Sequence, residues 1–204
     1  YIPVSIGIVL LMQTVWMGVL LEWFLDKKAP SAQKIISVII VLIGTALAIN
    51  IFKIDFNDPT IDWSNGLFWG LLAAASFTTT MFTANKVALG ISSAQRSLYM
   101  LLGGAVIVFG FSLYTQVTPF NFEIFTKWGI ILALFGTIIP PMLLNAGFPH
   151  TGIGLGSIVS SLELPVSVMM AFFLLNEQVL FIQWIGILLI ITAIVIMNIQ
   201  FKKK

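Results

Sequence analysis

Long apolar runs alternate with short polar breaks along the whole chain. The runs of span length have approximate limits 2 to 25, 34 to 53, 66 to 87, 95 to 116, 127 to 148, 152 to 175 and 180 to 201. An α-helix needs roughly 20 apolar residues to cross a bilayer. The runs are continuous, whereas the strands of a membrane barrel alternate apolar and polar positions. The pattern therefore predicts an all-α membrane protein with seven transmembrane helices.

Composition supports a membrane location and excludes several kinds of site. Of 204 residues, 59% are hydrophobic and 9% are charged, and the mean hydropathy is +1.05, so the polar residues are too few to coat a soluble globule. The chain has no cysteine and one histidine, which excludes a thiolate or histidine-cluster metal site. We expect no metal, no cofactor and no nucleic-acid partner.

The basic residues are distributed unevenly between the two sides that seven helices define. One side receives Lys27, Lys28, Lys34, Lys86, Arg96, Lys202, Lys203 and Lys204, whereas the other receives only Lys53 and Lys127. Cytoplasmic loops carry an excess of lysine and arginine. We therefore expect an integral protein of a bacterial plasma membrane, with a cytoplasmic C-terminus and residues 202–204 as a basic cytoplasmic tail.

The two ends of the chain resemble each other weakly. Residues 1–53 and 148–200 each contain an apolar run, a short polar break and a second apolar run. The alignment uses an offset of 150 that slips to 147, and it pairs Gln13 with Glu163. The first helix of each copy crosses the membrane in the opposite direction to its counterpart. Related segments of opposite orientation are typical of inverted-repeat transporters, whose binding sites lie at the repeat interface.

Several segments carry a family resemblance. They are NGLFWGLLAAASFTTTMFTANKVA (65–88), QRSLYMLLGG (95–104), LELPVSVMMAFFLLNE (162–177) and IQWIGILLIITAI (182–194). Together they resemble the second EamA domain of the drug/metabolite transporter superfamily, with Glu163, Pro165, Glu177 and Gly186 at motif positions. The chain departs from the pattern at Asn176, where glycine is usual, and at Leu164, which separates Glu163 from Pro165.

The resemblance implies a ten-helix inverted repeat built from two five-helix EamA units. Residues 66–201 are then a complete second repeat, 54–65 an outer loop, and 1–53 the last two spans of a first repeat. In that first repeat Val15 replaces the proline and Lys27 replaces the closing glutamate. We expect about three further spans to precede Tyr1.

Glu163 is the strongest candidate for a functional group. It lies near the centre of the apolar run 153–175, and an acid there costs roughly 2.5 to 3.5 kcal/mol in insertion experiments. Small and polar residues recur on its helical face: Gly152, Gly156, Ser160, Ser167 and Met170. This face either packs closely on another helix or lines a cavity in which Glu163 binds a substrate ammonium group, a proton, or both.

Prolines mark three candidate hinges. Pro165 frees the carbonyl of Ser161 and predicts a kink beside Glu163. Pro140 and Pro141 predict a bent or discontinuous helix that forms a substrate wall. The alternative for Pro165 is an ordinary proline that the membrane helix tolerates.

Further candidates come from polar residues at similar depth. We expect substrate contacts from Asn145, Gln13, Ser160, Ser167, Thr79, Thr83 and Trp16. The threonines can instead bond to their own helix, and Asn145 can bond across helices. Lys86 and Arg96 are interpreted as an inner gate or as snorkelling anchors. Trp23 is interpreted as an interfacial residue.

These features favour a secondary transporter, an exporter of a small metabolite, amino acid or drug-like compound. Proton coupling would use Glu163, and the protein would be a monomer or a homodimer. A seven-helix receptor is the alternative, but the last run lacks a lysine for retinal and the inverted repeat is not expected in a receptor. An enzyme is disfavoured because no catalytic set of residues can be assembled.

Overall fold

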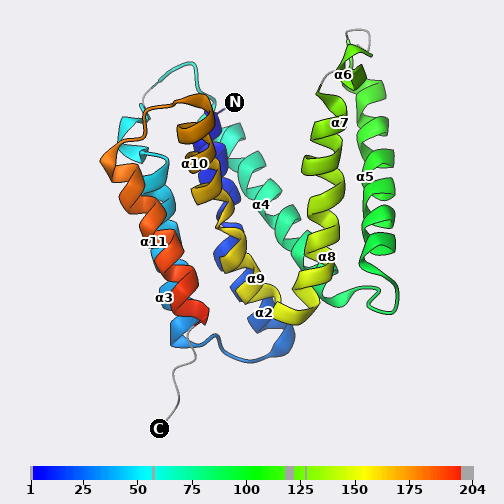
Figure 1. The fold of residues 1–204 in the computed structure, drawn as a ribbon, viewed down its shortest axis with the longest axis horizontal. Coiled ribbons are helices and arrows are strands. Elements are labelled where there is room, and N and C mark those ends of the chain that lie inside the picture. The colour runs from blue at the N-terminus through cyan, green and yellow to red at the C-terminus, as the bar shows by residue number, and fades with distance from the viewer. Residues whose placement is uncertain (1, 57, 118–121, 127, 199–204) are drawn as a thin grey trace. The chain divides into compact units, whose positions relative to one another are not determined.

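The structure, a computed structural model, describes residues 2–56, 58–117, 122–126 and 128–198. Tyr1, Lys127 and the predicted tail 202–204 lie outside the described residues. The described part is helical, with no strand (Figure 1). Its elements are α1 (Val4–Leu11), α2 (Thr14–Asp26), α3 (Ala32–Ala48), η1 (Ile51–Lys53), α4 (Trp63–Lys86), α5 (Ser93–Thr115), α6 (Glu123–Thr126), α7 (Gly129–Leu132), η2 (Ala133–Ile138), α8 (Ile139–Thr151), α9 (Ile153–Ser160), α10 (Glu163–Leu175) and α11 (Phe181–Asn198).

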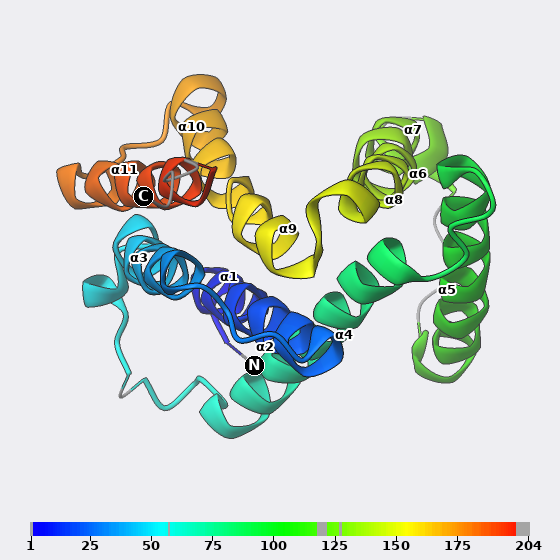
Figure 2. The same ribbon diagram turned by 90° about the horizontal axis from the view of Figure 1, so that it is seen from below.

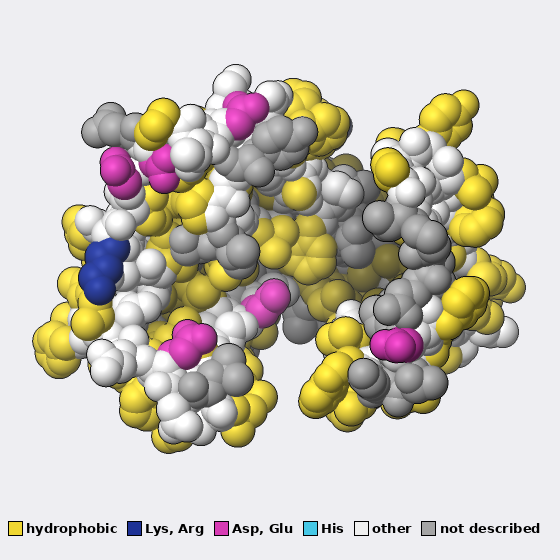
Figure 3. All heavy atoms as spheres, turned by 90° about the horizontal axis from the view of Figure 1, so that it is seen from above, with side chains coloured by type: hydrophobic (Ala, Val, Ile, Leu, Met, Phe, Trp, Pro, Cys, Tyr) yellow, Lys and Arg dark blue, Asp and Glu magenta, His cyan; other side chains and the backbone are white. Residues whose placement is uncertain are grey.

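The predicted membrane helices are confirmed. Six segments of the described chain are long and apolar enough to cross a bilayer: Ile6–Asp26, Trp63–Lys86, Ser93–Thr115, Gly129–Thr151, Ile153–Leu174 and Phe181–Asn198. The seventh, α3, is apolar but has 17 residues. Hydrophobic side chains make up much of the surface in Figure 3, as a lipid environment requires.

One break between two helices lies at a different position from the one predicted. Residues 149–151 were expected to form a turn, but α8 continues through Pro149 to Thr151 and ends at Gly152. Gly152 has φ 79, a conformation that glycine adopts without steric cost. Pro149 is tolerated because the carbonyl of Asn145, which it cannot bond, accepts a hydrogen bond from Arg96 Nη1 at 2.9 Å.

The chain divides into two compact units. Unit 1 contains residues 1–82 and 152–204, and unit 2 contains residues 83–151. In unit 1, α3 and α11 lie side by side and antiparallel (Figures 1 and 2). Small residues permit this approach: a Cβ on Gly44 would lie 2.9 Å from the carbonyl oxygen of Gly186. Ser37 Oγ also donates to the carbonyl of Ala193 at 3.1 Å.

Helices at the two ends of unit 1 have matching bounds. Adding 149 to the limits of α1, α2 and the start of α3 gives the limits of α9, α10 and the start of α11. Both α1 and α9 end at a short interruption, where Gln13 N donates to Leu10 O and Leu162 N donates to Val159 O. The shift of 149 replaces the predicted offset of 150, so Thr14 and not Gln13 is the counterpart of Glu163.

The buried clusters of unit 1 follow the same shift. One cluster contains Val15, Val19 and Val41, and the other contains their counterparts Leu164, Val168 and Ile190. These three pairs of residues correspond under the same shift as the helix bounds, with Val168 partly buried against its cluster.

Unit 2 is held together around a buried arginine. Arg96, on α5, donates from Nη1 to Asn145 O on α8, and from Nη2 to Thr83 O at 3.1 Å and to Ala84 O at the end of α4. It is 6% exposed. Arg96 therefore ties three helices together and does not snorkel to the membrane surface.

The prolines of unit 2 coincide with an irregular helix. The π-helix η2 covers Ala133–Ile138 and ends directly before Pro140 and Pro141. Wider π turns relieve the clash between a proline ring and the carbonyl four residues earlier. The helix is thus irregular just before the two prolines, and their role as a hinge stays a prediction.

Candidate functional site

A large apolar pocket lies within unit 1, between α2 and α4. Its volume is about 830 Å³, within the range of small-molecule sites. The residues that line it are Trp16, Met17, Leu20, Leu21, Trp23, Phe24, Lys27, Ala75, Thr78 and Thr79. The α2 residues recur every three or four positions and so form one face of the helix. Helix periodicity therefore builds this wall of the pocket.

At the start of α2, a side-chain hydrogen bond fixes the position of Trp16. Trp16 Nε1 donates to Gln13 Oε1 at 2.8 Å, and Gln13 Nε2 donates to the carbonyl of Val9 at 3.0 Å. Gln13 lies in the interruption between α1 and α2. The last backbone carbonyls of a helix lack a partner within the helix, so they can accept a hydrogen bond from a side chain. The interruption thereby anchors the indole ring that faces the pocket.

The α4 wall presents threonines whose hydroxyls are already engaged. Thr78 Oγ1 donates to Ala74 O and Thr79 Oγ1 donates to Ala75 O, each at 2.9 Å. Each hydroxyl oxygen can still accept a hydrogen bond. The α4 wall is thus mildly polar and has no charged group among its lining residues.

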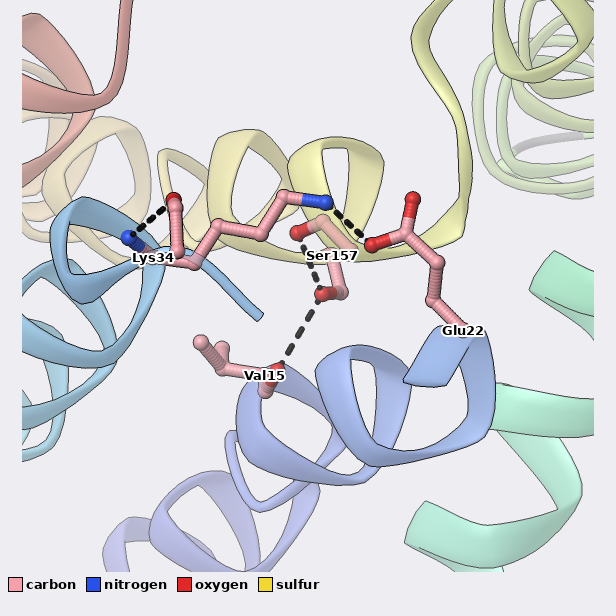
Figure 4. Close-up of polar contacts among 6 residues, drawn as sticks. Val15, Glu22, Lys34 and Ser157 are labelled. Atoms are coloured by element: carbon pink, nitrogen blue, oxygen red, sulfur yellow. Dashed lines mark hydrogen bonds and ion pairs between the residues drawn. The ribbon is translucent and has the colours of Figure 1, made fainter. Parts of the chain in front are cut away.

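Close packing of α2 on α9 supports the side of α2 that faces away from the pocket. A Cβ on Gly18 would lie 2.6 Å from Ser157 Oγ, so only glycine fits there. Ser157 Oγ lies 3.2 Å from the carbonyl of Val15 and 2.9 Å from that of Gly154 (Figure 4). Ser157 is fully buried. This contact fixes the position of α2 relative to α9.

An ion pair joins α2 and α3 at the lysine-rich end of unit 1. Lys34 Nζ on α3 donates to Glu22 Oε2 on α2, and both side chains are about one-fifth exposed (Figure 4). The pair lies over the first turn of α9, because a Cβ on Gly154 would clash with the Glu22 carboxylate and lie 3.3 Å from Lys34 Nζ. Glycine at position 154 therefore allows one ion pair to join α2, α3 and α9.

The pocket brings together only some of the predicted site residues. Trp16 and Thr79 line it, and Gln13 supports it from behind through Trp16. Glu163 and Ser167 are exposed on α10 and do not line this pocket. Ser160 donates to the carbonyl of Gly156 in its own helix at 2.9 Å.

The carbonyl of Ser161, which the sequence predicts to be freed by Pro165, accepts a hydrogen bond from Leu164 N at 3.3 Å. The helix is interrupted at residues 161–162, and α10 begins at Glu163. Pro165 itself is fully buried. Glu163 therefore lies in the first turn of α10.

The remaining predicted residues belong to unit 2 or its boundary. Asn145 is 2% exposed, and its Nδ2 donates to Ser97 Oγ at 2.9 Å, so it bonds across helices. Its Oδ1 is buried and has no hydrogen-bond partner. Thr83 accepts from Arg96 through its carbonyl, and Lys86 is exposed at the end of α4.

Sequence reasoning missed most of the pocket. Trp23 was interpreted as interfacial, yet it lines the pocket with Phe24 and Lys27. The signal was present, because Trp16, Leu20, Trp23 and Lys27 follow helical spacing. It was passed over because a stripe of aromatic residues in a membrane helix more commonly faces lipid.

Comparison with known families agrees with this architecture. A search of curated proteins gave no match. The model of the EamA-like transporter family matches residues 64–199, which is most of the chain. The chain therefore belongs to the EamA-like transporter family, whose members are membrane transporters of the drug/metabolite superfamily.

Proposed function

We propose that this protein is a secondary transporter that carries a small organic molecule through the pocket between α2 and α4. The observation that carries the proposal is the pocket itself: about 830 Å³, bounded by Trp16 and Thr79 and next to a helix interruption. Transporter sites commonly lie beside interrupted helices near the middle of the bilayer. Export is the direction that we propose.

Alternating access requires elements that move against one another. The pocket lies against α2, and α2 is tied to α9 and α3 through Gly18, Ser157 and the Glu22–Lys34 pair. We propose that opening at the lysine-rich end breaks this ion pair. The interruptions at residues 12–13 and 161–162 then allow the two halves of each helix to tilt separately.

We further propose that residues 1–53 are the last two helices of one EamA unit and that 66–201 form a second, complete unit of inverted orientation. The matching bounds at a shift of 149 support this, as does the antiparallel packing of α3 on α11. The C-terminus is then cytoplasmic by the distribution of lysines.

Proton coupling through Glu163 is a separate part of the proposal. It is supported by the position of this carboxylate at an interruption in the middle of a membrane helix. The test is transport by Glu163→Gln in proteoliposomes as a function of pH. We expect a reduced rate that no longer varies with pH. A full transport rate with unchanged pH dependence would refute the coupling role of Glu163. It would not bear on the proposed transport route through the pocket.

Filling the pocket tests the transport route. Ala75→Trp places a large side chain on the α4 wall, and Ala73→Trp on the same helix is the control because Ala73 does not line the pocket. We expect Ala75→Trp to abolish substrate-dependent counterflow and Ala73→Trp to retain it. Equal transport by the two variants would refute the proposed route.

A further inference from the structure

The pocket between α2 and α4 has a distinctive chemistry. Three of its lining residues, Trp16, Trp23 and Phe24, are aromatic, and most of the others are aliphatic. Aromatic side chains favour flat ligands through stacking and edge-to-face contacts. The Trp16 ring is held by its bond to Gln13 and so offers a preformed surface. The apolar part of the ligand is therefore expected to be an aromatic ring.

The charge at the pocket is positive. Lys27 is the charged residue among the lining residues, and no acid is among them. The two acids of α2, Glu22 and Asp26, line a different cavity, and Glu22 pairs with Lys34 there. The ammonium group of Lys27 forms no ion pair within the described chain. A carboxylate on the ligand would find a partner here, and an ammonium group would not.

Aromatic groups follow the α2 wall as far as its basic end, because Trp23 and Phe24 lie within about one helical turn of Lys27. Trp16 and Lys27 are eleven residues apart on α2, which corresponds to about 16 Å along a helix axis. Lys27 caps α2 in a left-handed conformation, with φ 52. Lys27 is exposed and lines the pocket, at the helix C-terminus, where a cation is electrostatically favoured.

We propose that the ligand of this pocket is an aromatic monocarboxylate without an ammonium group, with its ring against the aromatic side chains of Trp23 and Phe24 and its carboxylate at Lys27. This inference rests on the proposed function and refines it. It also replaces the ammonium substrate that Glu163 suggested from sequence, since Glu163 does not line the pocket.

The test uses three probes that share one ring and chain: 4-phenylbutyrate, 4-phenylbutanol and 4-phenylbutylamine. Their affinities for the purified full chain in phosphatidylcholine nanodiscs are measured by isothermal titration calorimetry at pH 7. We expect the carboxylate to bind most tightly and the amine most weakly. Lys27→Gln should weaken carboxylate binding about two- to fivefold, as expected for a partly exposed ion pair, and leave alcohol binding unchanged.

Lys28→Gln is the matched control, because Lys28 is the neighbouring lysine and does not line this pocket. It should bind all three probes as the wild type does. Equal affinities for the three probes, tightest binding of the amine, or equal effects of the two lysine variants would each overturn the proposed substrate class. Those outcomes leave the pocket as a binding site, provided that Ala75→Trp still abolishes alcohol binding.

Failure of the proposed function gives a different result. If none of the three probes binds, or if Ala75→Trp binds them as well as the wild type does, the pocket is not a ligand site. Both this inference and the transport route through the pocket are then refuted.

Discussion

Replacement of Gly186 by alanine tests the close packing of α3 on α11. A Cβ at this position would meet backbone atoms: Ala48 N, Gly44 O at 2.5 Å and Ala48 Cα at 2.9 Å. Real Cβ atoms essentially never approach within 3.0 Å of other atoms. Because backbone cannot turn aside as a side chain can, the two helices must separate.

The expected loss of stability has two parts. Overpacking of a close contact costs about 1 to 3 kcal/mol. Separation also weakens the hydrogen bond from Gln183 Nε2 to Ala48 O, now 2.9 Å, which contributes about 1 kcal/mol. The better helix propensity of alanine offsets about 0.5 to 1 kcal/mol. We therefore expect Gly186→Ala to destabilise the protein by about 1 to 3 kcal/mol.

Gly7→Ala is the matched control in the same unit. A Cβ on Gly7 would meet nothing within 4 Å, so only the gain in helix propensity applies. The assay is reversible unfolding of the purified protein in mixed micelles, followed by circular dichroism. If Gly186→Ala were as stable as Gly7→Ala, the close contact of α3 and α11 would be wrong.

Two further predictions concern α2 and α4. Gly18→Ala should destabilise unit 1 by about 1 to 3 kcal/mol because the new Cβ meets Ser157. Adding Ser157→Gly should restore part of the lost stability. Additive effects of the two substitutions in a double-mutant cycle would contradict the contact. Asn65 donates to Asp62 from its side chain and its backbone, and these bonds lower the pKa of Asp62 at the start of α4. This contribution to stability is present above the ordinary pKa of 3.8 and is lost as pH falls through the lowered value. In the wild type, the protection factors of the amides at the start of α4, taken relative to the intrinsic exchange rate at each pH, should therefore fall in strong acid. In Asp62→Ala they should be low at every pH, and equal protection in both proteins would contradict the cap.

The helices were predictable because they depend on local sequence. Apolar runs of span length specify membrane helices, and a proline removes a backbone donor wherever it occurs. The interruption at residues 12–13 has no such marker, since Trp16 stands at the position that Pro165 has in the other copy. Tertiary packing of α2 on α9 accompanies it and is not visible in local sequence.

The pocket and the buried arginine were not predictable for a related reason. An exposed position in a membrane helix faces either lipid or a cavity, and the two environments favour similar apolar residues. Trp23 was therefore assigned to the membrane interface. Arg96 lies near a helix end, where snorkelling is common, but its carbonyl partners come from α4 and α8, distant in sequence.

Thiol accessibility tests the central claim, which is that water and substrate reach the pocket between α2 and α4. The chain has no cysteine, so single cysteines can be introduced without background. Thr79→Cys lies in the pocket, and Ile39→Cys is the control at a similar depth on the exposed face of α3. Only a hydrated thiol ionises and reacts with a charged methanethiosulfonate reagent.

We predict that Thr79→Cys in membrane vesicles reacts rapidly with the reagent, that 4-phenylbutyrate slows the reaction, and that Ile39→Cys stays unreactive. Reaction of Thr79→Cys no faster than that of Ile39→Cys would contradict the account.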